Sequence, residues 1–308
     1  MKKACDSLRQ MQRLFRAAGS IFVPVPARSL LGIPPFIRPE TAMAHSLKSG
    51  AASVTPFRGP NQPDLESEIV WEARRDLAAT FRMAARYGFE EGICNHFSAL
   101  VPGHDDLFIV NPYGWAFREL TASKLLICDF HGNVVSGEGQ PEATAFYIHA
   151  RIHKNVPRAK VAFHTHMPYA TALSMTEGDP LIFAGQTALK FYGRTAIDRD
   201  YNGLALDERE GDRIAAAVGD ADIVFMKHHG VMVLGPNIAE AWDDLYYLER
   251  ACEVQALALA TGREVKPVKP EIAEAAYRQM REGDPESARL HLASIRRQLD
   301  AEEPIYRD

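Results

Sequence analysis

Two histidines one residue apart close an apolar run of this chain, Lys160-Val-Ala-Phe-His-Thr-His166. Alternate residues of a β-strand point to the same face of a sheet, so His164 and His166 can hold one metal ion together. A second apolar run further along the chain ends at His229. A third imidazole from that run would complete a three-histidine site with an open coordination position. An open position is what catalysis at a metal requires.

Length and composition limit the class of protein. A chain of 308 residues suits one large domain or two small ones and can bury a sizeable core. The net charge of -5 gives no indication of nucleic acid or an anionic membrane as a partner. The four cysteines show no Cys-x-x-Cys spacing, which favours a reduced cytoplasmic protein without disulfides. No apolar run reaches the roughly 18 residues of a membrane-spanning helix.

Residues 1–63 are predicted to form a poorly structured, basic and proline-rich extension. Its first part carries one acid, Asp6, against five basic residues, Lys2, Lys3, Arg9, Arg13 and Arg16. A transit peptide would be basic and poor in acids in this way. The favoured interpretation is a flexible leader, or translation from an upstream start codon with Met43 as the real start. Residues 44–63 are rich in Ser, Gly and Pro and are predicted to be a linker or loop.

Helical and strand patterns alternate from residue 64 onwards. Helices are predicted over 64–87, 141–155, 207–218 and 237–262, with two more within 270–300, and strands over 107–111, 125–130, 160–166 and 222–234. Short turns such as 112–114 and 131–133 join several strands, which favours a mixed or antiparallel sheet. Helices on both faces of that sheet would make an α/β fold. We expect one domain over 64–265, with helices in 266–308 packing on it.

Six short pieces of the chain occur in an order and spacing that resemble the class II aldolase/adducin family. They are residues 91–98 (EGICNHFS), 110–114 (VNPYG), 120–123 (LTAS), 149–157, 164–166 (HTH) and 229–230 (HG). The resemblance covers roughly two-thirds of the chain. It implies a three-layer α/β/α sandwich with a central, mainly antiparallel sheet. It also implies a homo-oligomer, commonly a tetramer, with active sites between subunits.

The resemblance also implies a divalent metal, most often zinc, with manganese or iron as alternatives. Carried over to this sequence, the ligands are His164, His166 and His229. His228 falls where relatives often have asparagine, so it is predicted to be a neighbour of the site, although an exchange with His229 stays open.

One position departs from the catalytic aldolases. These enzymes carry an acid/base glutamate where this chain has Ala145, and the adducin-like branch lacks that glutamate too. Glu142 falls on the same helical stripe as Ala145 and His149, one turn earlier and about 4.5 Å along the axis. Glu142 could therefore take the catalytic role. The alternative, which we favour, is a first-turn acid that complements the helix dipole.

Other candidate residues follow from the same resemblance. Asn95, His96 and Ser98 are placed in a loop where relatives hold the polar end of the substrate, and His96 is either an acid/base or a loop-stabilising residue. Asn111 and Gly114 form a turn whose backbone amides could bind an anion, or simply a tight turn. Tyr201 lies near the position at which aldolases supply a proton-donating tyrosine from the adjacent subunit.

These observations predict a divalent-metal-dependent carbon–carbon lyase, of aldolase or decarboxylase type, with Glu142, His96 and Tyr201 as candidate catalytic residues. A three-histidine metal stabilises the negative charge that forms when a carbon–carbon bond breaks. The missing glutamate makes a sugar-phosphate aldolase doubtful and favours a small non-phosphorylated hydroxy or oxo acid or aldehyde. Two alternatives remain: a non-catalytic binding protein like the adducin head, and an iron-dependent oxygenase.

Overall fold

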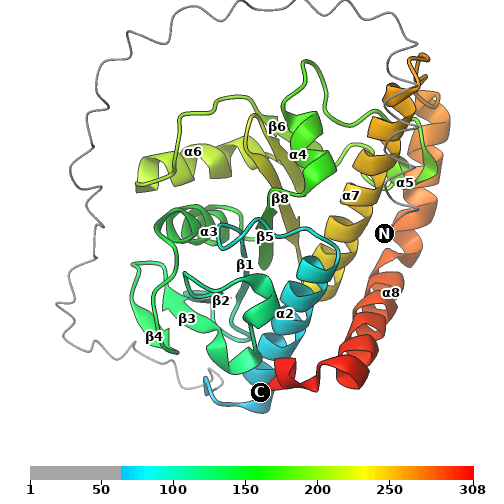
Figure 1. The fold of residues 1–308 in the computed structure, drawn as a ribbon. Helices are drawn as coiled ribbons and strands as arrows, with labels where there is room; N and C mark the ends of the chain where they lie inside the picture. The colour runs from blue at the N-terminus through cyan, green and yellow to red at the C-terminus, as the bar shows by residue number, and fades with distance from the viewer. Residues whose placement is uncertain (1–63) are drawn as a thin grey trace, which may run out of the picture. The chain divides into compact units, whose positions relative to one another are not determined.

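The computed structural model describes residues 64–308, which form an α/β fold around one eight-stranded sheet (Figure 1). The predicted extension over 1–63, including Met43, lies outside the described residues. The strand order is β4-β3-β2-β1-β5-β8-β7-β6. Their bounds are β1 His96–Leu100, β2 Leu107–Val110, β3 Leu126–Asp129, β4 Val134–Ser136, β5 Val161–Thr165, β6 Thr195–Asp198, β7 Ile223–Met226 and β8 Gly230–Gly235. Only β6 and β7 pair in parallel, so the predicted, mainly antiparallel sheet is confirmed.

Helices cover both faces of the sheet, which confirms the predicted three layers. Their bounds are α2 Glu68–Arg86, α3 Ala143–Asn155, α4 Pro168–Ser174, α5 Gln186–Leu189, α6 Glu208–Val218, α7 Ile238–Ala260 and α8 Pro270–Glu302, with short 3-10 turns η1 Phe117–Glu119, η2 Ala122–Lys124 and η3 Pro304–Arg307. Helices α3 and α6 pack on one face, and α2 and α7 pack on the other (Figure 1). Helix α8 lies against α7 and α2, outside these layers.

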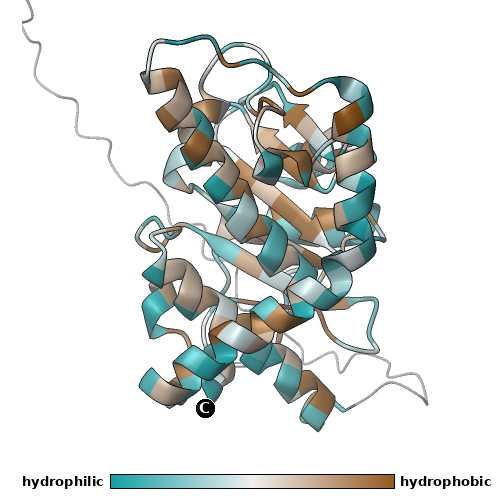
Figure 2. Cartoon of the chain, turned by 90° about the vertical axis from the view of Figure 1, so that its right-hand side faces the viewer, coloured by the Kyte–Doolittle hydropathy of each residue, from teal (hydrophilic) through white to brown (hydrophobic). Residues whose placement is uncertain are grey.

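Strand β5 shows how alternation places side chains on the two faces. Phe163 points to the α2/α7 face, where its ring stacks on Phe97 with centroids 4.1 Å apart. Ala162 points to the opposite face and packs with Ile148 of α3. Because His164 is two residues from Ala162, it lies on the α3/α6 face as well. Figure 2 shows the hydrophobic strands in the interior, behind helices whose surfaces carry many hydrophilic residues.

The predicted single strand over 222–234 is wrong, because the chain turns back on itself within it. Strands β7 and β8 form an antiparallel hairpin in which Met226 pairs with Gly230. The turn places His228 in the left-handed region, with φ of 58°. Both strands are fully buried, so the apolar run shows no alternation that would reveal where one strand ends and the next begins. The hairpin carries His229 at its tip.

Other predicted boundaries also need correction. The two helices predicted within 270–300 are one continuous helix, α8, which contains Pro285. Helix α3 begins at Ala143, after Pro141, and Glu142 is its N-cap. His96 and Ser98, predicted in a loop, lie on β1 and are buried in the middle of the sheet.

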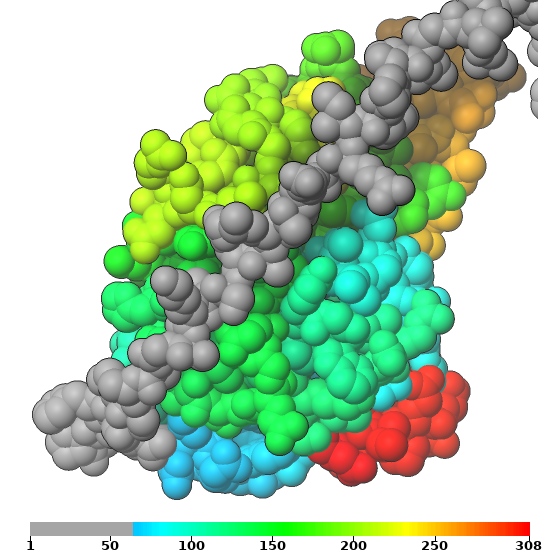
Figure 3. Space-filling view, turned by 60° about the vertical axis from the view of Figure 1, so that its left-hand side comes forward, coloured from blue at the N-terminus to red at the C-terminus, as the bar shows by residue number. Residues whose placement is uncertain are grey.

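The C-terminal segment returns to the beginning of the described chain. Turn η3 contacts α2 and η2, and the backbone N–H of Ser123 donates to the carbonyl of Asp308 at 2.7 Å. Figure 3 shows this segment in red beside the cyan and green surface formed by the first half of the domain. Within residues 64–308, no helix combines the length and the apolar character needed to cross a membrane.

Candidate metal centre

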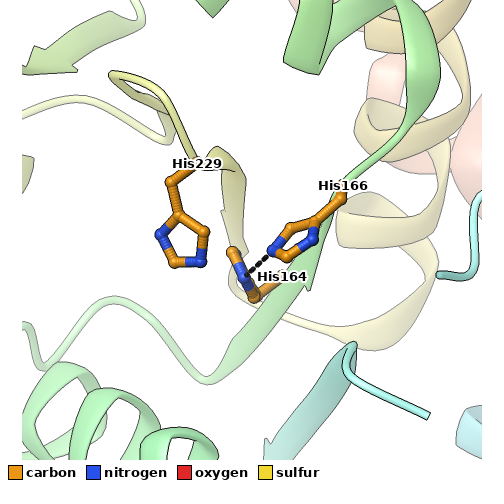
Figure 4. A group of neighbouring side chains, drawn as sticks. All are labelled: His164, His166 and His229. Carbon is orange, nitrogen blue, oxygen red and sulfur yellow. Dashed lines mark hydrogen bonds between the residues drawn. The ribbon is translucent and has the colours of Figure 1, made fainter. Parts of the chain in front are cut away.

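Three histidines from two strand ends converge on the α3/α6 side of the sheet (Figure 4). His164 is the second-last residue of β5, His166 follows directly after the strand, and His229 comes from the tip of the β7–β8 hairpin. One nitrogen of each ring lies within 4.8 Å of the others, and the Nε2 atoms of His164 and His166 are 3.2 Å apart. The structure therefore brings together the three residues that were predicted as ligands.

Gly230 lets the hairpin approach β5 closely enough to form this cluster. A Cβ atom at this position would lie 2.5 Å from the carbonyl oxygen of Thr165 and 2.8 Å from the His166 ring. Contacts this short are not tolerated, so any larger residue would push the hairpin tip away. The glycine after His229 thus has a direct role in placing the third imidazole.

Hydrogen bonds on the outer edges of two rings fix which nitrogens face the centre. His164 donates through Nδ1 to the carbonyl of Val231 at 2.9 Å. The Nδ1 of His166 bonds to the carboxylate of Glu91. A proton on Nδ1 leaves Nε2 with a lone pair, and this arrangement is how proteins commonly orient histidines that bind metals.

The charge state and spacing of the rings fit a divalent metal. Burial, reinforced by the neighbouring His229, lowers the pKa of His164 well below its ordinary value. Burial, reinforced by His166, lowers the pKa of His229 to about 4. Both rings are therefore neutral near pH 7, as metal ligands must be. In a tetrahedral zinc site with bonds of about 2.0–2.1 Å, two nitrogens lie roughly 3.3 Å apart, close to the separation seen here.

Glu91 is a site residue that the sequence analysis did not assign to any role, although it opens one of the motifs. Its side chain is 65% exposed and reaches His166, which is 75 positions further along the chain. The backbone N–H of Glu91 donates to Oδ1 of Asn95 at 2.8 Å. This hydrogen bond holds the backbone of Glu91 in place. No local pattern connects residues so far apart, so only the folded chain reveals this carboxylate–histidine pair.

Removing the Glu91 carboxylate is expected to weaken metal binding. Outer partners of metal-bound histidines contribute about 10–100-fold to metal affinity, so Glu91→Ala should raise the zinc dissociation constant by that factor. Glu91→Gln keeps an oxygen that can accept from His166 and should lose less. Competition with a chromophoric chelator measures both values, and Glu91→Ala with wild-type affinity would exclude the proposed orienting role.

An open pocket of about 570 Å³ lies beside the three histidines. Its wall combines polar groups around the cluster with an apolar side, and its lining residues are Glu91, Thr144, Ile148, His166, Pro168, Thr171, Ala172, Met175, Tyr201, Gly203, Leu204, Ala205, His228 and His229. None of these described residues is a lysine or an arginine. The pocket can therefore receive a small ligand at the candidate metal, but it offers no cationic side chain to an anion.

The candidate catalytic residues fall in different places. Tyr201 lines the pocket with its ring centroid 6.2 Å from that of His229, and it is 52% exposed. Glu142 is not among the pocket-lining residues. Its carboxylate accepts from the backbone N–H of Ala145 at 2.9 Å and from the hydroxyl of Thr144, so it caps α3. This contact corresponds to the favoured, helix-stabilising interpretation of Glu142.

The predicted substrate-binding residues are not on the pocket wall. His96 pairs directly with His164 across β1 and β5, and their rings stack with centroids 4.9 Å apart. Ser98 is fully buried and its hydroxyl contacts two further histidines. Asn111 donates through Nδ2 to the carbonyl of Asn95 at 3.2 Å, so the two asparagines lie side by side.

Each of these asparagines keeps one buried polar atom without a partner. These atoms are Nδ2 of Asn95 and Oδ1 of Asn111. Gly114, with φ of 90°, lies in the turn beyond Asn111, where Tyr113 and Trp115 are exposed. Substrate contacts by Asn95, Ser98, Asn111 and Gly114 stay predictions.

Two known proteins are similar in sequence to this chain over most of their own length. A protein from Caulobacter vibrioides described as a putative aldolase class 2 protein is 35% identical over 79% of this chain and 94% of its own length. A 4-hydroxy-3-prenylphenylpyruvate oxygenase/4-hydroxy-3-prenylbenzoate synthase from Streptomyces roseochromogenus is 30% identical over 73% of this chain and 81% of its own.

Solved structures agree with the sequence relatives. An aldolase II superfamily protein from Pseudomonas syringae superposes with a TM-score of 0.74 and 32% identity, covering 79% of this chain and 97% of the other. L-fuculose 1-phosphate aldolase from Glaciozyma antarctica superposes with a TM-score of 0.70 and 28% identity, covering 82% and 97%. The family model for the class II aldolase and adducin N-terminal domain matches residues 75–256, which include every histidine of the cluster. The sandwich fold and the histidine cluster agree with this match, and the chain belongs to the class II aldolase and adducin family.

Proposed function

We propose that this protein is a divalent-metal-dependent carbon–carbon lyase, of aldolase or decarboxylase type. Its substrate would be a small hydroxy or oxo acid or aldehyde without a phosphate group. The observation that carries the proposal is the cluster of three histidines, two of them held with Nε2 toward a common point, at the wall of an open pocket. A binding protein has no physical need for such a site.

His164, His166 and His229 would hold the metal, and zinc is the ion we propose for three neutral imidazoles. When bound, the metal supplies a Lewis acid that stabilises negative charge on a substrate oxygen. Tyr201 stands on the pocket wall with an exposed side chain, and we assign its hydroxyl the role of proton donor to the departing carbon. Glu91 would orient His166 through its bond to Nδ1.

The charge of the pocket supports a substrate without phosphate. Phosphate groups are bound in proteins by arginine, lysine or several backbone amides at a helix N-terminus. No lysine or arginine lines this pocket among the described residues, and Ile148, Met175 and Leu204 give it an apolar side. A ligand with one polar end at the metal and an apolar or uncharged remainder matches this wall better than a sugar phosphate does.

A second candidate function is oxygen chemistry with iron in the same site. The relative from Streptomyces roseochromogenus, described as an oxygenase, favours it. Imidazole nitrogen suits iron as well as zinc, so the ligand set does not separate the two metals.

We also propose a cytoplasmic homo-oligomer, with a tetramer as the expected form. Cys94, Cys128 and Cys252 are free thiols, which suits a reducing compartment. Tyr201, Leu204 and Leu206 are exposed apolar side chains beside the pocket, where a second copy of the chain would cover them.

The test compares metals, oxygen and substrates in one set of reactions. Protein loaded with zinc, manganese or iron is mixed with hydroxy and oxo acids and aldehydes, each with and without phosphate, and products are followed by nuclear magnetic resonance. We expect carbon–carbon cleavage of a non-phosphorylated compound with zinc under anaerobic conditions. Turnover that requires iron and consumes oxygen would establish the oxygenase instead. Metal binding without any turnover would favour a binding protein.

A further inference from the structure

A line of four buried polar side chains leads away from the candidate metal centre. It runs from His96 through His149 and Ser98 to His153, and we call these four residues the histidine–serine chain. The distances between neighbours are 2.8 Å from His96 Nδ1 to His149 Nε2, 2.5 Å from His149 Nδ1 to Ser98 Oγ, and 2.7 Å from Ser98 Oγ to His153 Nε2. All four residues are at most 4% exposed. Three imidazoles in one apolar layer need a reason beyond packing.

The end of the histidine–serine chain at His153 determines the direction of every hydrogen bond in it. His153 Nδ1 lies 2.9 Å from the carbonyl oxygen of Ala159, and a carbonyl can only accept. His153 must therefore carry its proton on Nδ1, which leaves a lone pair on Nε2. Ser98 donates its single hydroxyl proton to that lone pair and can then only accept from His149.

The same reasoning continues to the metal side. His149 donates to Ser98 through Nδ1, so its Nε2 has a lone pair and accepts from His96 Nδ1. His96 thus carries its proton on Nδ1 and has an unprotonated Nε2. His164 has the same tautomer, because its Nδ1 donates to Val231. The rings of His96 and His164 stack on each other, so both contribute an Nε2 lone pair to the same side of the sheet.

The surroundings keep these rings neutral, which the argument requires. Their hydrogen bonds go to one another, to Ser98 and to one carbonyl, and not to a carboxylate. All of them are buried, and burial lowers the pKa of His153, at the far end, to about 4. A neutral ring can donate through only one nitrogen, so each link in the chain has one direction.

We infer that the histidine–serine chain locks His96 with a free Nε2 lone pair beside His164, as the acceptor for a hydroxyl group of a substrate bound at the metal. His96 is 2% exposed and is not on the pocket wall, so the contact is made from the position of the metal. His149, Ser98 and His153 are positioning residues that act through His96. The inference rests on the proposed function, and it narrows the substrate to a compound that presents an O–H donor next to its metal-binding oxygen. An α-hydroxy acid or α-hydroxy aldehyde has such a pair of oxygens.

The tautomers themselves can be measured without any substrate. Long-range proton–nitrogen correlation spectra of the nitrogen-15-labelled full chain show, for each histidine, which ring nitrogen carries the proton. We expect His96, His149 and His153 each to carry it on Nδ1, and loss of one signal set in His96→Gln identifies His96. A proton on Nε2 of His96 in the wild-type protein would overturn the inference.

Ser98→Ala tests whether the histidine–serine chain fixes the tautomer of His96. Without the hydroxyl, His149 has no acceptor for its Nδ1 proton, so we expect His96 to lose its single Nδ1–H form and show both tautomers. Thr80→Ala is the matched control, because it removes another buried hydroxyl, one bonded to the carbonyl of Leu77 in α2. It should leave the His96 signals unchanged. An unchanged His96 in Ser98→Ala would also overturn the inference.

The outcome separates this inference from the proposed function. If the wild-type tautomers are as expected and every lyase assay fails, the inference about His96 stands. Only the proposed lyase function is then rejected. A second readout uses a non-reacting α-hydroxy acid: its affinity for the zinc-loaded protein should fall at least about twofold in Ser98→Ala, because no more than about half of His96 is then expected to keep the Nδ1–H form that can accept the hydroxyl. The same compound without the hydroxyl should bind both proteins equally. If Ser98→Ala still prefers the hydroxy acid over this analogue as strongly as the wild type does, the role assigned to the histidine–serine chain is contradicted.

Discussion

Replacing His166 by alanine is expected to remove almost all bound metal from the purified protein. Loss of an outer partner alone costs about 10–100-fold in affinity, and loss of a ligand costs more because only His164 and His229 remain. Elemental mass spectrometry on protein purified without a histidine tag should find about one ion per wild-type chain. In His166→Ala it should find less than about a tenth of that. A full complement of metal in the variant would disprove the proposed site.

His228→Asn is the matched control for this experiment. His228 is the neighbour of His229 in the hairpin turn, it is exposed, and its backbone φ is 58°. Asparagine tolerates this left-handed conformation better than alanine, so the turn should keep its shape. We expect His228→Asn to retain the metal. Loss of metal here, with retention in His229→Ala, would show that the two adjacent histidines exchange roles.

The clustering of the three histidines was predictable from the sequence in two steps. Alternation on a strand places His164 and His166 on one side, and the structure shows their Nε2 atoms 3.2 Å apart. The family motifs then supplied His229. The antiparallel sheet was predictable from the short turns between strands. The β7–β8 hairpin was not, because its strands are buried on both faces and its turn contains no typical turn pair.

The surroundings of the centre were less accessible to sequence reasoning. Glu91 and His166 meet only after β1 and β5 have paired, and Ser98 reaches His149 through a helix that packs on the sheet. Such contacts depend on the relative placement of elements, for which a single sequence carries no periodic signal. Glu142 had two interpretations from the sequence, a catalytic acid and a helix-stabilising acid, and its N-cap contact at the start of α3 corresponds to the second, which was favoured.

A buried cluster of charges on the other side of the sheet was also invisible in the sequence. Lys190, at the end of α5, lies 3.1 Å from Asp243, 3.3 Å from Asp244 and 2.8 Å from Asp284. These carboxylates come from α7 and α8, and Arg194 also contacts Asp244. One ammonium group thus connects three helices. Asp284 of this cluster lies next to Pro285, within the segment that was predicted to form two helices and forms α8 instead.

Lys190→Met is expected to lower the free energy of unfolding by about 3–5 kcal/mol, because it leaves buried carboxylates without their cation. Urea unfolding followed by circular dichroism measures the change. Lys266→Met is the control: this lysine is 79% exposed and 3.9 Å from Glu264, so its removal should change stability by no more than about 0.5 kcal/mol. Adding Asp284→Asn to Lys190→Met removes one unpaired charge and should restore part of the stability. A Lys190→Met protein within about 1 kcal/mol of wild type would contradict the role assigned to the cluster.

The pH dependence of stability gives the cluster a second signature. Burial opposes ionisation of Asp243, but the bond from His291 and the charge of Lys190 outweigh it and lower the pKa of Asp243 below its ordinary 3.8. Burial likewise disfavours charged Lys190, but Asp244, Asp284 and Asp243 together raise the pKa of Lys190 above 10.5. The carboxylate's contribution is present above pH 3.8 and is lost as the pH falls below it. The ammonium's contribution is present below pH 10.5 and is lost above it. Without Lys190, burial would raise the pKa of these carboxylates in the folded protein, so the folded state would bind protons more readily than the unfolded state. The stability that Lys190→Met loses relative to wild type should therefore shrink as the pH falls. A loss that does not shrink on acidification would show that Lys190 does not hold these carboxylates ionised.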